Sequence, residues 1–336
     1  MSASPILIRC DASTLVGTGH VMRCLTLAEA MAGREVWFAC AEITKPLAER
    51  VRQRGHRLVA VPGPRGGDAD LSATLELLGQ CGGAVLDGYA YGAEYRRAVA
   101  GAGRPVLALD DTGEVRLHAQ LIANPSPAAH PALYAAEPGA ELLLGPAYAL
   151  VAAPLLEARA QPGGGAHSLL VTFGGSDPLG LTLPVTRALA TKLGAGCLHV
   201  VVGGSVAGRD GVAAELRALG VRGEVDVRAM GPLLRGCRLA VSAGGSTLYE
   251  LAALGRAMVL VVVADNQDAA ARQAACDGWA VSIDGRAADG VEGIVQAAVA
   301  LWRDGDRLAA LGQAAERRVD GEGARRVAGR FLAKLV

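Results

Sequence analysis

Short apolar runs of strand-forming residues alternate with helix-like stretches along most of this chain. In the first half the runs lie at 5–10, 35–41, 57–61, 84–87 and 105–109, and a helical pattern covers 21–31. The runs are apolar throughout, as expected for strands of a sheet that is covered on both faces. Strands that alternate with helices are typical of parallel βαβ units. The chain is therefore expected to be an α/β protein, with ligand sites in the loops at the carboxyl ends of its strands.

The strand pattern restarts after a polar, Gly-rich interruption at 161–165, which is the best linker candidate. Further runs follow at 168–173, 198–202, 225–228, 239–242 and 258–263. Domains commonly hold about 100–200 residues, so 336 residues favour two consecutive doubly wound domains. We expect these domains at 1–160 and 166–316, followed by a helical segment at 317–336.

Charge and composition exclude several classes of protein. Lys plus Arg and Asp plus Glu each number 33, and this balance argues against nucleic-acid binding. A hydrophobic share of 51% argues against disorder. No apolar run is long enough for a membrane span, and the first residues do not resemble a signal peptide. The 7 cysteines lack Cys-x-x-Cys spacing, so neither disulfides nor a metal site is expected. We therefore expect a cytoplasmic location.

The first strand-like run leads into a Gly-rich loop that carries a histidine. Gly17-Thr18-Gly19-His20 precedes the helical pattern, and Asp11 stands at the end of the strand. Such glycines allow a close backbone approach to a ligand, and a helix N-terminus attracts anions. Three interpretations are open. In the first, His20 is a general base, a role that suits an imidazole near neutral pH. In the second, His20 merely caps the helix. In the third, the loop is a dinucleotide fingerprint, which would need a glycine in place of Met22.

The loop also resembles a known family. Gly17-Thr18-Gly19-His20-Val21-Met22-Arg23-Cys24-Leu25, preceded by Arg9-x-Asp11-Ala12-Ser13, closely resembles the opening of the UDP-2,4-diacetamido-2,4,6-trideoxy-β-L-altropyranose hydrolases of pseudaminic acid biosynthesis. The resemblance implies a GT-B fold, in which two Rossmann-like domains face each other across a cleft and the final helix crosses back to the first domain. It implies that His20 and Asp11 are catalytic, with Asp11 holding either the imidazole or a group of the sugar, and that Gly17, Thr18, Gly19 and Arg23 surround the substrate.

Two further strand ends of the first half carry candidate residues. Asp87-Gly88-Tyr89 matches the family's Asp-His-Tyr at its first and third positions, which implies that Asp87 contacts the substrate and that Tyr89 lines the sugar site and takes part in catalysis. Gly88 departs from the family pattern. The alternative is a strand that ends in a turn, with Tyr89 as a semi-buried aromatic residue. Asp110 and Asp111 end the next strand, where capping of the following segment is favoured over metal binding.

The second half has two glycine-rich loops after buried strands, namely Gly174-Gly175-Ser176 and Gly244-Gly245-Ser246-Thr247. Glycines leave room for a phosphate, and the helices that follow can hold an anion. A plain turn is the alternative for the first loop. The second loop resembles the donor-binding signature of MurG-like glycosyltransferases. The resemblance also implies substrate contacts from Asn266 and Gln267, and from the loop of Met230 through backbone groups.

Glu250 has two competing interpretations. The resemblance implies that its carboxylate holds the ribose hydroxyls of UDP. However, Thr247-Leu248-Tyr249-Glu250 also has the spacing of a capping box, in which the glutamate folds back to the start of its helix. Ribose binding is favoured, because a cap does not require the glycines that precede it.

The resemblance implies an enzyme that hydrolyses a UDP-linked diacetamido-trideoxy sugar at the anomeric C–O bond. The products would be UDP and a free sugar for nonulosonic acid biosynthesis, with no cofactor and no membrane or nucleic-acid partner. His20 would deprotonate a water molecule, and a single displacement would invert the anomeric centre. The rival functions are a GT-B UDP-sugar glycosyltransferase, a UDP-sugar 2-epimerase and a non-catalytic UDP-sugar-binding protein.

Overall fold

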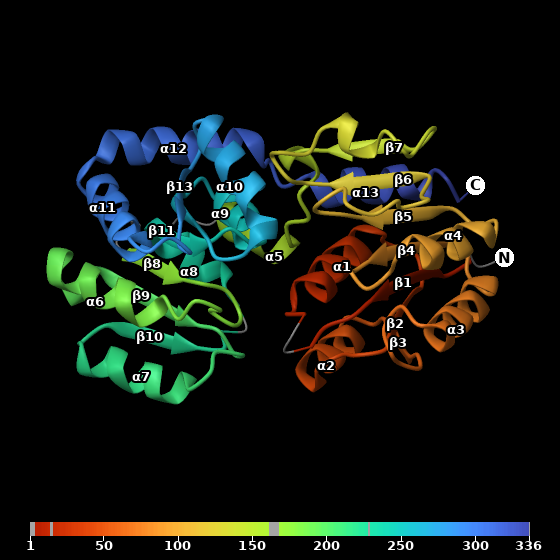
Figure 1. The fold of residues 1–336 in the computed structure, drawn as a ribbon, viewed down its shortest axis with the longest axis horizontal. Coiled ribbons are helices and arrows are strands. Elements are labelled where there is room, and N and C mark those ends of the chain that lie inside the picture. Colours follow the sequence, from red (N-terminus) through yellow and green to blue (C-terminus); the bar gives the residue numbers. More distant parts are fainter. Residues whose placement is uncertain (1–3, 14–15, 161–167, 228, 336) are drawn as a thin grey trace. The chain divides into compact units, whose positions relative to one another are not determined.

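Two compact units make up the computed structural model of this chain (Figure 1). Unit 1 comprises Met1–Leu150 and Glu322–Val336, and unit 2 comprises Val151–Gly321. The structure describes residues 4–13, 16–160, 168–227 and 229–335, so the expected linker at 161–165 lies outside the described residues. Unit 1 ends before helix α5 (Ala153–Ala160), which belongs with unit 2.

Unit 1 is built on a parallel sheet of seven strands in the order β3-β2-β1-β4-β5-β6-β7. The strands are β1 (Ile6–Cys10), β2 (Val36–Cys40), β3 (Arg57–Ala60), β4 (Gly83–Asp87), β5 (Val106–Leu109), β6 (Leu121–Asn124) and β7 (Glu141–Leu144). The first five lie where the sequence predicts strands. The last two were not predicted, because no α-helix separates them from β5 or from each other and the segment around them is rich in Pro and Ala.

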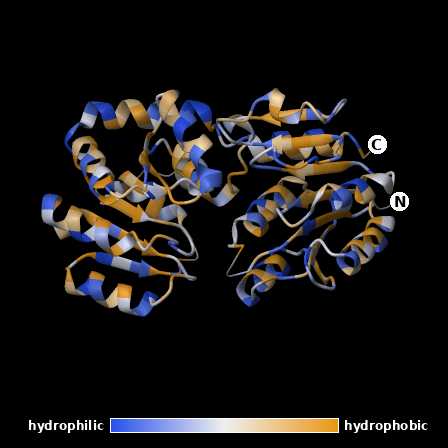
Figure 2. Ribbon diagram, in the orientation of Figure 1, coloured by the Kyte–Doolittle hydropathy of each residue, from blue (hydrophilic) through white to orange (hydrophobic). Residues whose placement is uncertain are grey.

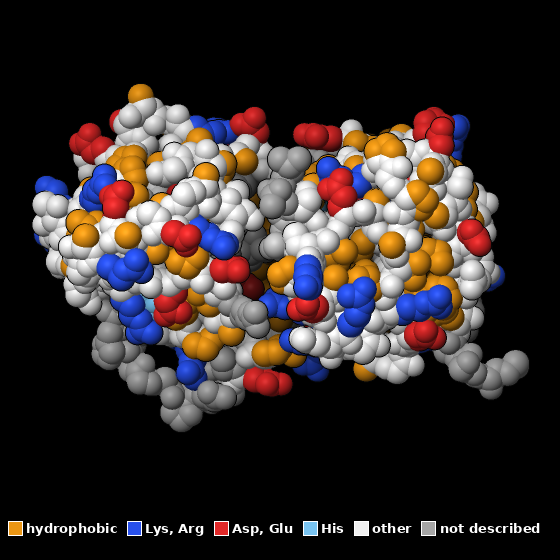
Figure 3. Space-filling model, turned by 90° about the horizontal axis from the view of Figure 1, so that it is seen from below, with side chains coloured by type: hydrophobic (Ala, Val, Ile, Leu, Met, Phe, Trp, Pro, Cys, Tyr) orange, Lys and Arg blue, Asp and Glu red, His pale blue; other side chains and the backbone are white. Residues whose placement is uncertain are grey.

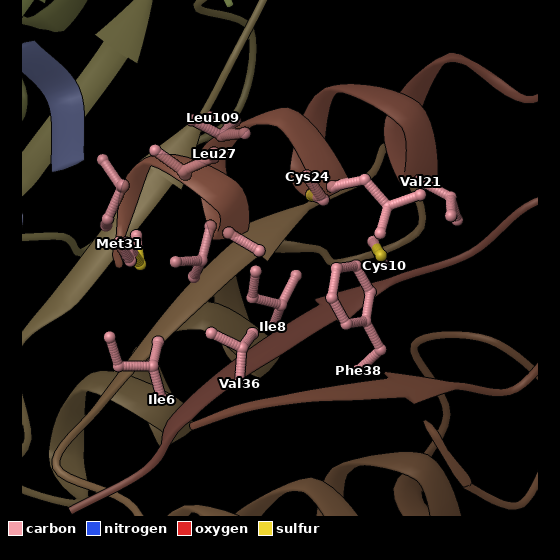
Figure 4. Packing of buried hydrophobic residues seen from close by; sticks show 14 of the residues in the cluster. Ile6, Ile8, Cys10, Val21, Cys24, Leu27, Met31, Val36, Phe38 and Leu109 are labelled. Atoms are coloured by element: carbon pink, nitrogen blue, oxygen red, sulfur yellow. The ribbon is translucent and has the colours of Figure 1, made fainter. Parts of the chain in front are cut away.

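The helices of unit 1 cover this sheet with apolar faces. They are α1 (Gly19–Ala30), α2 (Lys45–Gln53), α3 (Asp68–Gly79), α4 (Ala93–Gly101) and α13 (Gly323–Leu332), with short 3-10 turns at Pro131–Tyr134 and Pro146–Tyr148. Figure 4 shows Val21, Cys24 and Leu27 of α1 above Ile8 of β1 and Phe38 of β2. Helix α13 packs beside α1, and its Val327 and Phe331 belong to the same buried cluster.

Unit 2 has a parallel sheet of six strands in the order β10-β9-β8-β11-β12-β13. Its strands are β8 (Ser168–Thr172), β9 (Leu198–Val202), β10 (Arg222–Val225), β11 (Cys237–Ala243), β12 (Ala257–Val262) and β13 (Val281–Asp284). Besides α5, its helices are α6 (Thr182–Leu193), α7 (Arg209–Ala218), α8 (Gly231–Gly236), α9 (Thr247–Ala253), α10 (Asp265–Cys276), α11 (Gly290–Arg303) and α12 (Gly305–Arg318). A 3-10 turn lies at Ala195–Cys197. Instead of the strand predicted at 225–228, the structure has β10 three residues earlier in the chain. This strand ends at Val225 because Asp226 adopts a left-handed backbone conformation (φ 51°).

Both sheets have the doubly wound strand order, with a reversal between β1 and β4 in unit 1 and between β8 and β11 in unit 2. Their central strands are strongly apolar (Figure 2). Ligands of such sheets bind at the carboxyl ends of the strands beside the reversal, which is where the candidate loops of each unit lie. The predicted C-terminal helical segment consists of two helices, since Gly321 (φ 89°) separates α12 from α13.

The surface shown in Figure 3 carries basic and acidic side chains interspersed on both units, in keeping with the balanced composition. Among the described residues, no helix has both the length and the apolar character that crossing a membrane requires.

Candidate functional site

His20 and Asp87 form a close pair at the strand reversal of unit 1. His20 lies in the first turn of α1, and Asp87 is the last residue of β4. The Nδ1 atom of His20 is 2.7 Å from Oδ1 of Asp87, so Nδ1 carries the proton and donates to the carboxylate. The Nε2 atom has no hydrogen-bond partner among the described residues and is not fully buried. The imidazole can therefore accept a proton at Nε2 while Asp87 fixes its orientation.

His20 does not cap its helix. Helix α1 begins at Gly19, its N-cap residue is Thr18, and that residue makes no side-chain capping hydrogen bond. Gly17 has a left-handed backbone conformation (φ 79°) and donates its N–H to the carbonyl of Ser13. Thr18 and Gly19 are exposed or partly exposed, so this part of the loop presents backbone to solvent directly before the histidine.

Arg23 joins the histidine pair to a second carboxylate. Its Nε and Nη2 donate to the two oxygens of Asp87 at 2.7 and 2.6 Å, and its Nη1 donates to Asp111 at 2.7 Å. The hydroxyl of Tyr89 donates to the other oxygen of Asp111 at 2.7 Å. The ring of Tyr89 meets that of His20 edge to face, with 5.0 Å between centroids. One connected network thus holds His20, Arg23 and Tyr89 together.

Ionised carboxylates maintain this network. Burial by itself raises the pKa of Asp87, but Arg23 and His20 hold it well below its ordinary value. Burial likewise opposes the charge of Arg23, and the carboxylates of Asp111 and Asp87 raise the pKa of the guanidinium well above its ordinary value. The thiol of Cys24 also donates to Asp87 at 3.3 Å. Asp87 is completely buried, and its two oxygens accept from His20, Arg23 and Cys24; that it contacts a substrate stays a prediction.

Asp11 belongs to a different network and does not hold the imidazole of His20, which was one of the two roles expected for it. Its Oδ1 accepts the N–H groups of Ala41 and Glu42, at 2.7 and 2.9 Å. Its Oδ2 accepts Nη1 of Arg9 at 2.8 Å and the hydroxyl of Tyr91 at 2.7 Å. Both oxygens are used to tie β1 to the loop after β2. The carboxylate that was expected near the imidazole is supplied by Asp87.

Tyr89 is presented to solvent by the turn after β4. The residue is 56% exposed, which contradicts the alternative that it is a semi-buried aromatic. The turn depends on Gly88, whose φ of 155° is rare for other residues. A Cβ atom at this position would lie only 3.0 Å from the ring of Tyr91. The histidine that the family has here would therefore strain this turn.

Asp110 caps the segment that follows β5, as predicted, whereas Asp111 does not cap it and pairs with side chains of other elements. Asp110 accepts the N–H of Gly113 and the hydroxyl of Tyr134, each at 2.7 Å. Asp111 is held by Arg23 and Tyr89, as described above. Among the described residues, no group of three or more His, Cys, Asp or Glu side chains is placed to hold a metal ion.

In unit 2 the predicted loops follow three adjacent strands, β8, β11 and β12. Gly174, Gly175 and Ser176 are exposed after β8, and Asp177 closes that turn by accepting the N–H groups of Leu181 and Thr182. Gly245 and Ser246 follow β11 and lead into α9, whose first residue is Thr247. Asp177 was not predicted as a site residue from the sequence, although its carboxylate stabilises the start of α6.

Glu250 does not form a capping box. The N-cap of α9 is Ser246 rather than Thr247, and the carboxylate of Glu250 has no hydrogen bond or ion pair with any residue that the structure describes. The residue is partly buried, and desolvation of its carboxylate raises its pKa to about 7. A side chain of this kind is free to bind a ligand hydroxyl.

The other predicted residues of unit 2 occupy loop and helix-start positions. Asn266 is exposed in the first turn of α10. Gln267 follows it, and its side-chain oxygen accepts the N–H of Val263 at 3.2 Å, so this amide braces the turn after β12. Met230 is the N-cap residue of α8, in the segment between β10 and β11.

Comparisons with known proteins show the fold. No protein-family model matches the chain, and no curated protein matches it significantly. Among solved structures, MurG of Acinetobacter baumannii is similar, with a TM-score of 0.66 and 18% identity over 98% of this chain and 99% of that one. Alr3699/HepE of Anabaena, solved with UDP-glucose, has a TM-score of 0.65 and 13% identity over the same shares. The spinosyn rhamnosyltransferase SpnG has a TM-score of 0.59 and 19% identity over 94% and 95%.

These similarities extend over nearly the full length of each chain. The protein therefore has the GT-B fold, built from two Rossmann-like units, as the sequence resemblance implied. Identities below 20% carry no further conclusion about its activity, and membership of the hydrolase family stays a prediction.

Proposed function

We propose that this protein is a UDP-sugar-dependent glycosyltransferase in which His20 is the general base. The observation that carries the proposal is the 2.7 Å contact of His20 Nδ1 with Asp87, which leaves Nε2 to accept a proton. A solved structure of similar fold contains UDP-glucose, and another is a rhamnosyltransferase. Both support a nucleotide-sugar substrate.

The nucleotide is assigned to the loops of unit 2. Backbone N–H groups at Gly174–Ser176 and at Gly245 and Ser246 would stabilise the diphosphate, as preorganised donors do for developing negative charge. Glu250 would accept the ribose hydroxyls, and the Met230 loop and Asn266 would contribute further contacts. This role is supported by the carboxylate of Glu250, which has no hydrogen bond or ion pair with any described residue.

The reaction is a single displacement at the anomeric carbon. Nε2 of His20 takes the proton of an attacking hydroxyl, and the electron pair of the breaking C–O bond leaves with UDP. Asp87 keeps the imidazole in the productive tautomer, while Arg23 keeps Asp87 ionised. Tyr89 is placed to contact the sugar because it is exposed and touches the imidazole.

A second candidate uses water as the acceptor. The loop from Gly17 to Leu25 resembles UDP-sugar hydrolases over a long and specific motif. The protein would then release UDP and a free diacetamido-trideoxy sugar. The same base and the same leaving group serve both candidates, so only the acceptor distinguishes them.

Release of UDP from a panel of UDP-sugars tests the proposal. His20→Ala should lose about 10²–10⁴-fold in turnover while its affinity for UDP stays unchanged. His130→Ala is the matched control, since His130 is exposed and outside the network. Residual turnover close to that of the wild type would overturn the assignment of His20, and tight UDP binding with no turnover on any substrate would favour a binding protein.

The acceptor is identified by the products. UDP release that requires an added glycosyl acceptor supports the transferase. Release without an acceptor, with ¹⁸O from labelled water appearing in the free sugar, supports the hydrolase. Label in UDP would indicate cleavage of the P–O bond and would contradict both candidates.

A further inference from the structure

The thiol of Cys24 donates to Asp87 but has no part in the mechanism described above. Cys24 lies one turn after His20 on α1, and its Sγ atom is 3.3 Å from Oδ2 of Asp87. Both side chains are completely buried. Water therefore cannot replace the thiol, and a change at Cys24 acts directly on the carboxylate that orients the histidine.

The two oxygens of Asp87 each accept two hydrogen bonds. Oδ1 accepts Nδ1 of His20 at 2.7 Å and Nη2 of Arg23 at 2.6 Å. Oδ2 accepts Nε of Arg23 at 2.7 Å and the thiol of Cys24. A carboxylate offers about four lone-pair positions to donors, so the thiol fills the last of them. Without the thiol, Oδ2 would keep a lone pair that is buried and unsatisfied.

Other titratable and charged groups face this pair from the elements packed around it. They are Arg23 on α1, Cys10 on β1, Arg96 on α4, Tyr89 after β4 and Asp111 after β5. Arg23, Tyr89 and Asp111 are joined by hydrogen bonds that do not involve Cys24, and Arg96 donates to backbone carbonyls. The thiol of Cys10 keeps its proton, since its contact with Cys24 and its burial raise its pKa well above the ordinary value. Cys24 therefore acts on the histidine through Asp87.

A thiol suits this position better than a hydroxyl. Burial raises the pKa of the Cys24 thiol to about 11, so it stays a donor near neutral pH. Thr26, on the same helix, donates its hydroxyl to the carbonyl of Met22 at 3.2 Å. A hydroxyl at position 24 would have the same option at the carbonyl of His20, four residues earlier. The thiol is also a weak donor, so it satisfies Oδ2 of Asp87 and leaves most of the negative charge to the histidine.

We propose that Cys24 is a positioning residue that sets the base strength of His20 through Asp87. A carboxylate with one donor fewer attracts the imidazole proton more strongly, so loss of the thiol favours the protonated histidine. His20 would then hold, at neutral pH, a proton at the position where a general base must accept one. The proposal rests on the proposed function for the use of His20 as a base, whereas the effect on the imidazole does not depend on turnover.

NMR titration of the His20 ring, assigned with His20→Gln, measures this effect without a substrate. In Cys24→Ala the titration midpoint should move to higher pH by about half a unit, as expected for the loss of one weak hydrogen bond. Cys24→Val also lacks the donor but fills its space, and should move the midpoint in the same direction. Cys81→Ala is the matched control and should leave the midpoint unchanged. Cys81 is a buried thiol of unit 1 that makes no hydrogen bond with any residue that the structure describes.

An unchanged midpoint in Cys24→Ala, or a midpoint at lower pH, would overturn the proposal. A shift in Cys24→Ala that is absent from Cys24→Val would also overturn it, because the cause would then be the cavity and not the lost donor. The infrared S–H stretching band gives a second readout in whichever variant folds. The band missing from that variant should lie at lower frequency than the band missing from Cys81→Ala, because only Cys24 donates to a carboxylate. Equal frequencies would show that Cys24 makes no such hydrogen bond and would overturn the proposal.

Kinetics of the same variants separate this proposal from the proposed function. If His20 is the general base, the acidic limb of the profile of kcat/KM against pH should move in Cys24→Ala by the same amount as the NMR midpoint. The affinity for UDP, measured by calorimetry, should stay unchanged. A moved NMR midpoint, together with no UDP release from any substrate, would retain the role of Cys24 and reject the proposed function. A moved midpoint with an unmoved acidic limb would likewise retain that role and reject His20 as the base of the reaction.

Discussion

The Oδ1 atom of Asp87 lies 2.7 Å from Nδ1 of His20, although 67 positions separate the two residues in the chain. The strand reversal creates this contact. Strands β1 and β4 are neighbours in the sheet, so the helix after β1 starts next to the end of β4. A histidine is thereby oriented by a buried carboxylate at the usual ligand-binding edge of a doubly wound sheet.

Asp87→Asn should remove most of the activity while retaining the shape of the site. An amide cannot stabilise the imidazolium that forms when His20 accepts a proton, so we expect a loss of about 10²–10⁴-fold in kcat. Steady-state UDP release measures it. The affinity for UDP, measured by calorimetry, should stay unchanged, and Asp265→Asn, which alters a side chain that is 98% exposed in unit 2, is the control. Full activity in Asp87→Asn would contradict the positioning role.

Gly88→His should destabilise the turn after β4. The variant introduces the histidine that the hydrolase family, which this sequence resembles, has at this position. The backbone at φ 155° and the 3.0 Å approach to Tyr91 both oppose a side chain, at a cost of about 1–3 kcal/mol. Thermal unfolding and UDP release measure the effect. Gly92→Ala is the matched control in the same segment, since Gly92 has φ −66° and open space around it. Equal melting temperatures for the two variants would show that the turn accommodates a side chain.

Much of the fold could be predicted from the pattern of apolar runs. Strand β12 (Ala257–Val262), for example, is a continuous apolar segment that is buried throughout, and such a segment has few other possible arrangements. Strands β6 and β7 were missed because no α-helix separates β5, β6 and β7 in the chain, so the alternation of strands and helices that marks the other strands is absent there. The helical segment at the C-terminus was predicted, but the break at Gly321 depends on a backbone conformation that composition alone does not indicate.

The candidate site was predicted in part. His20 was identified because a histidine follows a double-Gly loop at the start of a helix. Its partner could not be identified, since Asp11 and Asp87 both end strands next to the reversal, and only the direction of each side chain distinguishes them.

Phe331→Ala should destabilise unit 1 through the loss of the α13 anchor. Phe331 is completely buried beside α1, and such truncations cost about 3–5 kcal/mol. Hydrogen exchange resolved by peptide should show faster exchange in β1 and α1, with little change in β8 and β11 of unit 2. Arg325→Ala, on the exposed side of the same helix, should change stability by no more than about 0.5 kcal/mol. Uniform protection in Phe331→Ala would show that α13 contributes little to unit 1.

Glu250 should make unit 2 less stable as the pH rises from about 4.5 to about 7. The pKa of this carboxyl is about 7 in the folded protein, against 4.5 for an ordinary glutamate, so the unfolded chain releases its proton first. Below this window both states are protonated and there is no penalty. Above it the loss approaches about 3 kcal/mol at most. Denaturant titrations of Glu250→Gln should lack this slope and show higher stability at pH 8, and equal slopes in both proteins would contradict the raised pKa.

The same carboxyl should make ribose binding depend on pH. If Glu250 binds the hydroxyls as a carboxylate, binding releases its proton, and affinity should be about tenfold weaker at pH 6 than at pH 8. Uridine is the suitable probe, because the phosphate of UDP titrates in the same window. Calorimetry in two buffers of different ionisation enthalpy should detect the released proton. Glu250→Gln should bind uridine more weakly and without this pH dependence, whereas unchanged affinity in that variant would show that the ribose is bound elsewhere.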